Sequence, residues 1–194
     1  MAFQGPRRHI DHHLHSAVAL LGQTHPSQKS GFGLSVVLDE AHTITLSTGA
    51  ASAGNIGITG TTSGTAGGVV ENLTLISGTG TTTLDDAVGA GGEIGTLILQ
   101  ADNASATGLV TFDGAVTADT ITTYGRAYSV AFNAGGTITN DTTFANVGSI
   151  TLGDDAGDSL TFTGGLDTTS GSGTNIAGTV ATTDTQMDLG AVTM

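Results

Sequence analysis

The sequence predicts an all-β protein, a right-handed parallel β-helix (β-solenoid) of about six coils that follows an irregular N-terminal segment. Three observations indicate this fold: the composition, a repeating pattern of short segments, and an alternation of apolar and polar residues within those segments. Thr and Gly, with 35 and 31 residues, make up about a third of the 194-residue chain. Because Thr, Val and Ile favour strands and Gly favours turns, this composition predicts strands and argues against helices.

The chain divides into two parts of different composition. Residues 1–43 contain all six His, both Pro and three of the four basic residues, and their formal charge is zero. Residues 44–194 contain 14 acidic residues and one basic residue, Arg126, so they carry the whole net charge of −13. We expect residues 1–43 to be an irregular cap, a tail or the product of a misassigned start codon, and residues 44–194 to be the solenoid.

Short apolar triplets recur through the second part at similar intervals. They begin at Ile44, Leu73, Leu97, Ile121 and Ile150, with a looser match at Ile176. A second strand-like segment follows each triplet, at 56–59, 81–84, 109–112, 129–132, 160–163 and 186–189. A third, shorter apolar step often comes next, as at Val88 and Val116. Such a repeat is typical of solenoids, in which stacked coils bury apolar faces that no single coil can bury.

Apolar and polar residues alternate within these segments, as where Ile44 and Leu46 flank Thr45. This period of two predicts strands with one buried side, and stacking such strands about 4.8 Å apart places equivalent residues in columns. One predicted internal column contains Ile44, Leu73, Leu97, Ile121 and Ile150, and another contains Leu84, Phe112, Phe132, Phe162 and Leu189. A sandwich of hairpins is the rival fold, but two-residue hairpin signals are rare here and the turns vary in length.

Two longer stretches resemble large repetitive bacterial surface proteins of the filamentous-haemagglutinin and autotransporter type. These stretches are AYSVAFNAGGTITNDTTFANVGSITLGDDAGDSLTFTGGL (Ala127–Leu166) and TNIAGTVATTDTQMDLGAVTM (Thr174–Met194). The resemblance covers about residues 44–194 and implies an exported, rod-like parallel β-helix with a role in adhesion or surface structure. The sequence shows no recognisable secretion signal or anchoring domain, and its pattern stops at Met194, so we expect a fragment of a longer chain.

Composition excludes several classes of protein. Four Lys and Arg residues are too few to displace counterions from nucleic acid, so no nucleic-acid partner is expected. No apolar run reaches the length of a membrane-spanning helix. The absence of Cys excludes disulfides and thiolate metal sites.

Two groups of residues are candidate metal ligands. His9 and His13 have the i, i+4 spacing that puts two imidazoles on one side of a helix, although a His-rich tail also binds metal adventitiously. The turn GDDAGDS carries Asp154, Asp155 and Asp158, whose carboxylates suit Ca²⁺, but a solvated turn between strands has the same composition. Otherwise the sequence predicts no cofactor.

Tyr124, Arg126 and Tyr128 form the candidate ligand-binding group. In an extended segment the three side chains point to one side, where aromatic rings that flank a cation suit a sugar. A carbohydrate-acting β-helix enzyme is an alternative function, and it requires paired carboxylates in a groove. The acidic residues here are dispersed over turns, so the sequence identifies no catalytic residue.

Ice binding is the further alternative, and it requires a flat array of paired outward Thr residues. The triplets provide only a single outward column, composed of Thr45, Thr74, Ile98, Thr122 and Thr151. The leading prediction is therefore a non-catalytic, stiff acidic spacer or adhesive segment outside the cell or at its surface. Host or surface glycans and neighbouring repeat segments are the expected partners, and open strand edges predict end-to-end self-association.

Overall fold

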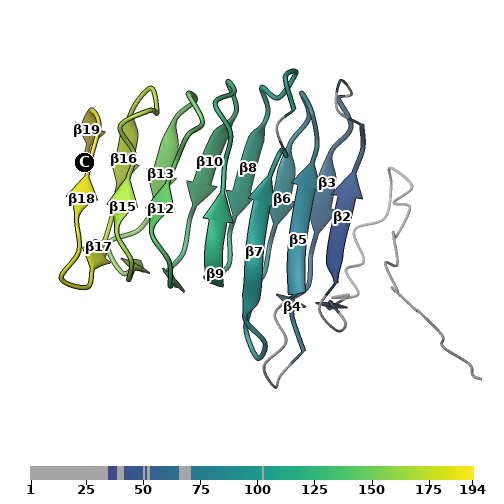
Figure 1. Cartoon of the computed structure of the whole chain (residues 1–194), viewed down its shortest axis with the longest axis horizontal. Helices are drawn as coiled ribbons and strands as arrows, with labels where there is room; N and C mark the ends of the chain where they lie inside the picture. Colours follow the sequence, from purple (N-terminus) through teal and green to yellow (C-terminus); the bar gives the residue numbers. More distant parts are fainter. Residues whose placement is uncertain (1–34, 39–41, 50, 52, 66–70, 102) are drawn as a thin grey trace, which may run out of the picture.

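The computed structural model describes residues 35–38, 42–49, 51, 53–65, 71–101 and 103–194. These residues form a β-solenoid of about six coils whose strands pair in parallel, and they include no α-helix. Figure 1 shows the strands of successive coils side by side along the long axis of the molecule. No helix in the described part has the length and apolar character that a membrane crossing requires.

The strands stack on three faces, to which the coils contribute in turn, and one coil contributes only the bridge residue Val88 to the third face. The first face contains β2 (Thr43–Ser47), β5 (Glu71–Ile76), β7 (Ile94–Leu99), β9 (Val116–Thr122), β12 (Thr142–Thr143), β15 (Leu166–Asp167) and β18 (Met187–Asp188). The second face contains β3 (Ile56–Ile58), β6 (Thr82–Leu84), β8 (Leu109–Phe112), β10 (Ser129–Phe132), β13 (Ile150–Leu152), β16 (Thr174–Ile176) and β19 (Val192–Thr193). The third face contains β1 (Val36–Val37), β4 (Thr62–Ser63), β11 (Gly136–Ile138), β14 (Ser159–Phe162) and β17 (Thr179–Thr182).

The long strand β9 connects the third face to the first. Its start pairs with β11, from Val116 to Ala118, and its end pairs with β7, from Ala118 to Thr122. In Figure 1 the chain rises along β5, β7 and β9 in front and returns behind while it advances toward the C-terminal coil. This course is right-handed, as the sequence predicts and as crossovers between parallel strands usually are.

The predicted columns are correct in the first four coils. Ile44, Leu73, Leu97 and Ile121 lie in register on the first face. Leu84, Phe112 and Phe132 lie in register on the second face.

The later members of both predicted columns are wrong. Ile150 belongs to the second face, where it pairs with Val130 and Thr174. Phe162 belongs to the third face and pairs with Ile138, and Leu189 follows β18 on the first face. The cause is a change in coil length, because register partners on the second face are closer together in sequence in the later coils than in the earlier ones.

The solenoid also includes residues that the sequence assigned to the irregular segment. β1 pairs in parallel with β4, and the neighbouring Leu38 is buried in the core. The ordered ladder therefore begins before residue 44. His9 and His13, the candidate metal ligands of the N-terminal segment, lie outside the described residues.

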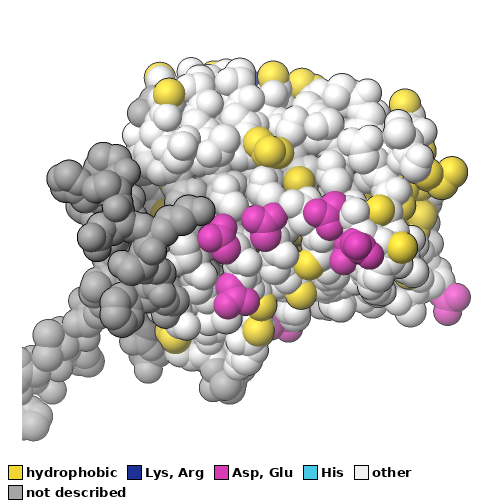
Figure 2. Space-filling model, turned by 180° about the vertical axis from the view of Figure 1, so that it is seen from behind, with side chains coloured by type: hydrophobic (Ala, Val, Ile, Leu, Met, Phe, Trp, Pro, Cys, Tyr) yellow, Lys and Arg dark blue, Asp and Glu magenta, His cyan; other side chains and the backbone are white. Residues whose placement is uncertain are grey.

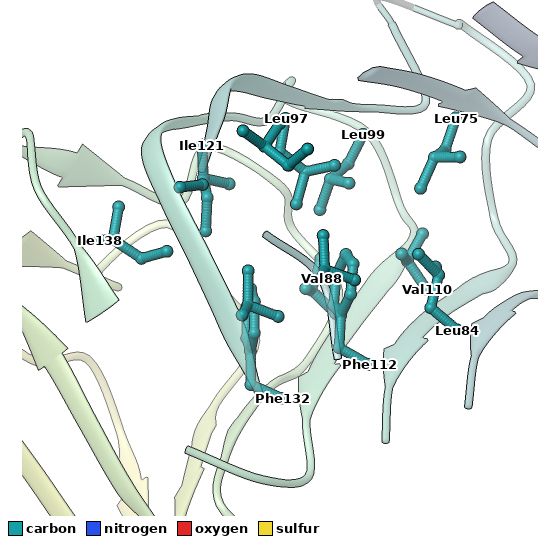
Figure 3. Packing of buried hydrophobic residues seen from close by; sticks show 14 of the residues in the cluster. Leu75, Leu84, Val88, Leu97, Leu99, Val110, Phe112, Ile121, Phe132 and Ile138 are labelled. Carbon is teal, nitrogen blue, oxygen red and sulfur yellow. The ribbon is translucent and has the colours of Figure 1, made fainter. Parts of the chain in front are cut away.

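The core is a continuous apolar column between the three faces. Figure 3 shows Leu97, Leu99 and Ile121 on one side of this column and Phe112 and Phe132 on the other. The rings of Phe112 and Phe132 are stacked, with centroids 5.0 Å apart and planes 12° apart. Phe144 continues the series edge-on to Phe132 and to Phe162, at 6.0 and 6.2 Å. Because each coil supplies little apolar surface of its own, these contacts between coils hold the rod together.

Candidate functional site

The acidic turn between β13 and β14 uses its carboxylates to order its own backbone. Asp158 Oδ2 accepts hydrogen bonds from the N–H groups of Asp154 (2.9 Å) and Asp155 (2.8 Å). Asp155 Oδ1 accepts a hydrogen bond from the N–H of Gly157 at 3.0 Å. The contact between Asp155 and Gly157 is typical of an Asx turn. Among the described residues, no group of three or more His, Asp or Glu side chains is arranged to hold a metal ion.

This turn lies on an acidic ridge at the corner between the second and third faces. Asp85, Asp113 and Asn133 each directly follow a strand of the second face, and each donates its backbone N–H to the preceding coil. The Asn133 side-chain amide donates to Asp113 Oδ1 at 2.8 Å, so the two side chains are linked between coils. Figure 2 shows acidic side chains in a row along this side of the rod. The ridge therefore concentrates negative charge on one corner.

The candidate ligand-binding group of Tyr124, Arg126 and Tyr128 does not share one side of a strand. Residues 123–128 form a turn between β9 and β10, so the extended geometry that the prediction assumed is wrong. Tyr128 is fully buried, whereas Tyr124 and Arg126 are half-buried at the corner. The Arg126 Nη1 donates to the carbonyl of Gly125 at 3.2 Å.

Tyr128 has a structural role in the interior. Its hydroxyl donates to the carbonyl of Leu99 (3.2 Å) and accepts the N–H of Tyr124 (2.9 Å), so it closes the turn against the preceding coil. Burial raises the pKa of Tyr128 from 10.0 to about 12, although its hydrogen bonds partly oppose the shift. The phenol, already protonated at neutral pH, therefore keeps its proton in more alkaline solution than an exposed tyrosine does, and the bond to Leu99 requires that proton.

Glu71 is a buried carboxylate that the sequence pattern did not identify. It begins β5, and its side chain has no exposed surface. Its carboxylate accepts hydrogen bonds from the Thr65 N–H at 3.2 Å and from the Thr65 hydroxyl. Since a buried carboxylate is costly without partners, these contacts explain how it is accommodated. Neither strand periodicity nor composition signals this contact.

Two parallel columns of outward side chains cover the first four strands of the first face. One column contains Thr43, Asn72, Thr96 and Thr120, and the other contains Thr45, Thr74, Ile98 and Thr122. Thr74 is nevertheless buried, with 6% of its surface exposed. All eight side chains are uncharged, in a chain whose net charge is −13. Two acidic residues adjoin these columns along the strands: Glu71 precedes Asn72 in β5 but is buried, and Asp119 precedes Thr120 in β9 and is partly exposed.

The sequence predicted only the second of these columns. It placed Thr151 there as well, but that residue lies on the second face beside Ala131 and Asn175, which is a correction to the prediction. The first column was missed because the triplet pattern begins one residue after Thr43 and Asn72. If the alternation is followed one residue beyond each triplet, it also includes the residue before the triplet. The Thr-x-Thr pairs at 43–45 and 120–122 then become visible in the sequence.

The chain has no match among known protein families, curated proteins or solved structures.

Proposed function

We propose that the described part of the chain is a stiff, acidic, non-catalytic spacer in an exported surface protein. The uninterrupted ladder of the second face carries this proposal, because one sheet of seven strands runs from β3 to β19. Hydrogen bonds in such a ladder point along the rod, so bending the rod stretches them on one side. The resemblance to filamentous-haemagglutinin and autotransporter-type β-helices agrees with this role.

The charge distribution supports a display role outside the cell. The acidic ridge keeps neighbouring rods apart by like-charge repulsion, which favours solubility. The turns that carry Asp154 and Asp155 are exposed and are therefore accessible to a partner. Host or surface glycans and neighbouring repeat segments are the partner classes that we propose for these turns.

The use of the carboxylates supports a structural role rather than acid–base catalysis. A glycosidase requires two carboxyl groups that face the scissile bond from opposite sides. Here Asp155 and Asp158 bond to the backbone of their own turn, and Asp113 bonds to Asn133 in the next coil.

Single-molecule pulling on both ends of the chain tests the spacer role. A stiff solenoid is expected to hold its length and then lose one coil at a time, because each coil is held by its neighbours. The coil between the bonded pair Ser129 and Ser149, which are 20 positions apart, releases about 70 Å of chain when it unfolds. The same chain in concentrated denaturant is the control and should extend without steps. Smooth extension at low force in native buffer contradicts the proposal.

Ice binding is a second candidate function, and the paired columns on the first face favour it. The positions of these columns form a lattice, with neighbours about 4.8 Å apart between strands and about 6.6 Å apart along a strand. Thr side chains at most of these positions supply hydroxyl and methyl groups, with Asn72 and Ile98 as interruptions and Thr74 buried. Such a lattice holds water in an ordered layer, and the absence of charged side chains in the columns avoids disrupting it. β2, β5, β7 and β9 are also the longest strands of the described part.

The double variant Thr96→Tyr and Thr120→Tyr tests the second candidate. Bulky rings in the outward columns are expected to abolish thermal hysteresis, because they prevent flat contact with a crystal face. The matched control is Thr111→Tyr with Thr151→Tyr, at outward positions of β8 and β13 on the second face, and it should keep full activity. Absence of hysteresis in the unmodified chain, or equal loss in the control, excludes ice binding.

A further inference from the structure

Gln100 is a buried side-chain amide at the corner between the first and second faces. It directly follows β7, and Ser77 directly follows β5, so the two residues occupy the same corner in successive coils. Gln100 Oε1 accepts hydrogen bonds from the N–H groups of Ser77 and Gly78, both at 3.1 Å, and Nε2 donates to Ser77 Oγ at 2.9 Å. Neither Gln100 nor Ser77 has exposed surface. The amide therefore joins the ends of two neighbouring strands through three buried hydrogen bonds.

The backbone of Gln100 has a conformation that favours glycine. Its φ is 64°, in the left-handed region where an L side chain is strained. Such a residue persists only when its surroundings compensate for the strain, and here the three hydrogen bonds of the side chain do so.

The apolar core does not distinguish between registers of β5 and β7. The inward residues of these strands are Leu73, Leu75, Leu97 and Leu99, all fully buried, and three of them are labelled in Figure 3. Because side chains alternate with a period of two, a shift of β7 by two residues along β5 keeps all four inward and again places leucine opposite leucine. The backbone ladder re-forms after such a shift as well, since it is made by main-chain groups.

The buried amide does distinguish between these registers. A shift of two residues moves Gln100 about 6.6 Å relative to Ser77, which breaks all three hydrogen bonds. The polar groups then stay in the interior without partners, and this is costly. Asn72 makes another side-chain bond between the strands, to the N–H of Thr96 at 2.8 Å, but that contact is only partly buried and water can replace it.

Buried polar side chains join the next two coils at the same corner. The Tyr128 hydroxyl donates to the carbonyl of Leu99 at 3.2 Å, and Asn146 Nδ2 donates to the carbonyl of Tyr128 at 3.1 Å. Tyr128 and Asn146 have no exposed surface. Three successive junctions therefore each have a buried hydrogen bond from a different side chain.

We propose that Gln100 determines the register of β7 on β5, and that Tyr128 and Asn146 do the same at the next two junctions. Each of these side chains reaches its partner in one register only, so strands with interchangeable leucines pair in a single way. A buried Asn fixes the register of coiled coils by the same principle. The inference rests on the fold and goes beyond the proposed spacer role, and its test follows strand pairing alone.

Two pairs of introduced cysteines report the register, since the chain has no Cys of its own. Thr74→Cys with Ile98→Cys marks the native register, because these residues are partners about 4.8 Å apart, within the range of a disulfide. Thr74→Cys with Thr96→Cys marks the slipped register, because these residues are about 8 Å apart until β7 shifts by two residues. Free thiols counted after refolding in air give the oxidised share of each pair.

Gln100→Met removes the amide and keeps the size of the side chain. In the otherwise unmodified chain, the native pair is expected to oxidise and the slipped pair to keep its thiols. Gln100→Met is expected to raise the oxidised share of the slipped pair at least ~10-fold and to lower that of the native pair, because slipped registers no longer bury an unpaired amide.

The matched control is Asn146→Leu, which removes a fully buried amide two junctions further along the rod. It is expected to leave both cysteine pairs as they are in the unmodified chain. Unchanged oxidation of both pairs in Gln100→Met overturns the proposal, as does an equal effect of Asn146→Leu. Circular dichroism checks folding, and if Gln100→Met does not fold, Gln100→Asn, whose amide is one methylene group shorter, is measured with the same pairs and the same criteria.

Discussion

Phe112→Asp is expected to unfold the central coils of the rod. Phe112 has no exposed surface, and its ring stacks on that of Phe132 at 5.0 Å. The substitution removes that contact and places a carboxylate in an apolar interior, and the buried residues of the described part include no basic side chain. Loss of the ring together with burial of an unpaired charge is expected to cost at least ~4 kcal/mol, a large share of the stability of a typical domain.

The matched control for this substitution is Thr111→Asp. Thr111 precedes Phe112 in β8 but points outward and is partly exposed, so the same carboxylate remains in water. The control is expected to change the free energy of unfolding by less than ~1 kcal/mol. Thermal unfolding followed by circular dichroism measures both variants. Equal melting temperatures for the two variants contradict the assignment of Phe112 to the core.

Gly108→Ala is expected to destabilise the corner between the first and second faces. A Cβ atom on Gly108 lies 1.7 Å from the carbonyl oxygen of Gly80, the residue that occupies the same corner in the preceding coil. A Cβ atom on Gly80 in turn lies 2.2 Å from the carbonyl oxygen of Gly54. The obstructing atoms are backbone, so the coils must separate. We expect a loss of about 2 to 3 kcal/mol in the free energy of unfolding.

Gly57→Ala is the control for this steric effect. Gly57 is the central residue of β3, and a Cβ atom there meets no atom within 4 Å. The added methyl group is expected to be neutral or to raise stability by up to ~1 kcal/mol, because Gly weakens a strand. Denaturant unfolding with both variants distinguishes the cases. Tolerance of Ala at Gly108 shows that the coils are not in close contact at that corner.

Strand positions were predictable from the sequence because each strand has its own local signal. The alternation around Thr45 and around Thr111 indicates one buried side, and both segments are strands. The face to which a strand belongs cannot be read from a fixed repeat length, because the coils differ in length. The triplet at Ile150 looks like that at Ile44, yet it lies on a different face because the preceding coils are shorter.

The candidate surfaces were predictable only where side-chain direction follows from strand alternation. Thr45 and Thr122 are outward, as the alternation predicts. Tyr128 was predicted to lie beside Arg126 at the surface, but the chain turns there and Tyr128 enters the core. Turn geometry depends on hydrogen bonds such as that from Tyr128 to Leu99, which joins residues of different coils and has no local sequence signal.

The unequal coils have a consequence for how such a protein evolves. On the second face the chain from Thr82 to its register partner Val110 is much longer than the chain from Thr174 to its partner Val192, while the ladder between them is continuous. Corners therefore gain or lose residues without disturbing the faces, because the register of each strand is set by its neighbours and not by the length of the connecting turn. Insertions at a corner can therefore create new surface loops while the rod itself is unchanged. The length of the rod depends separately on the number of whole coils.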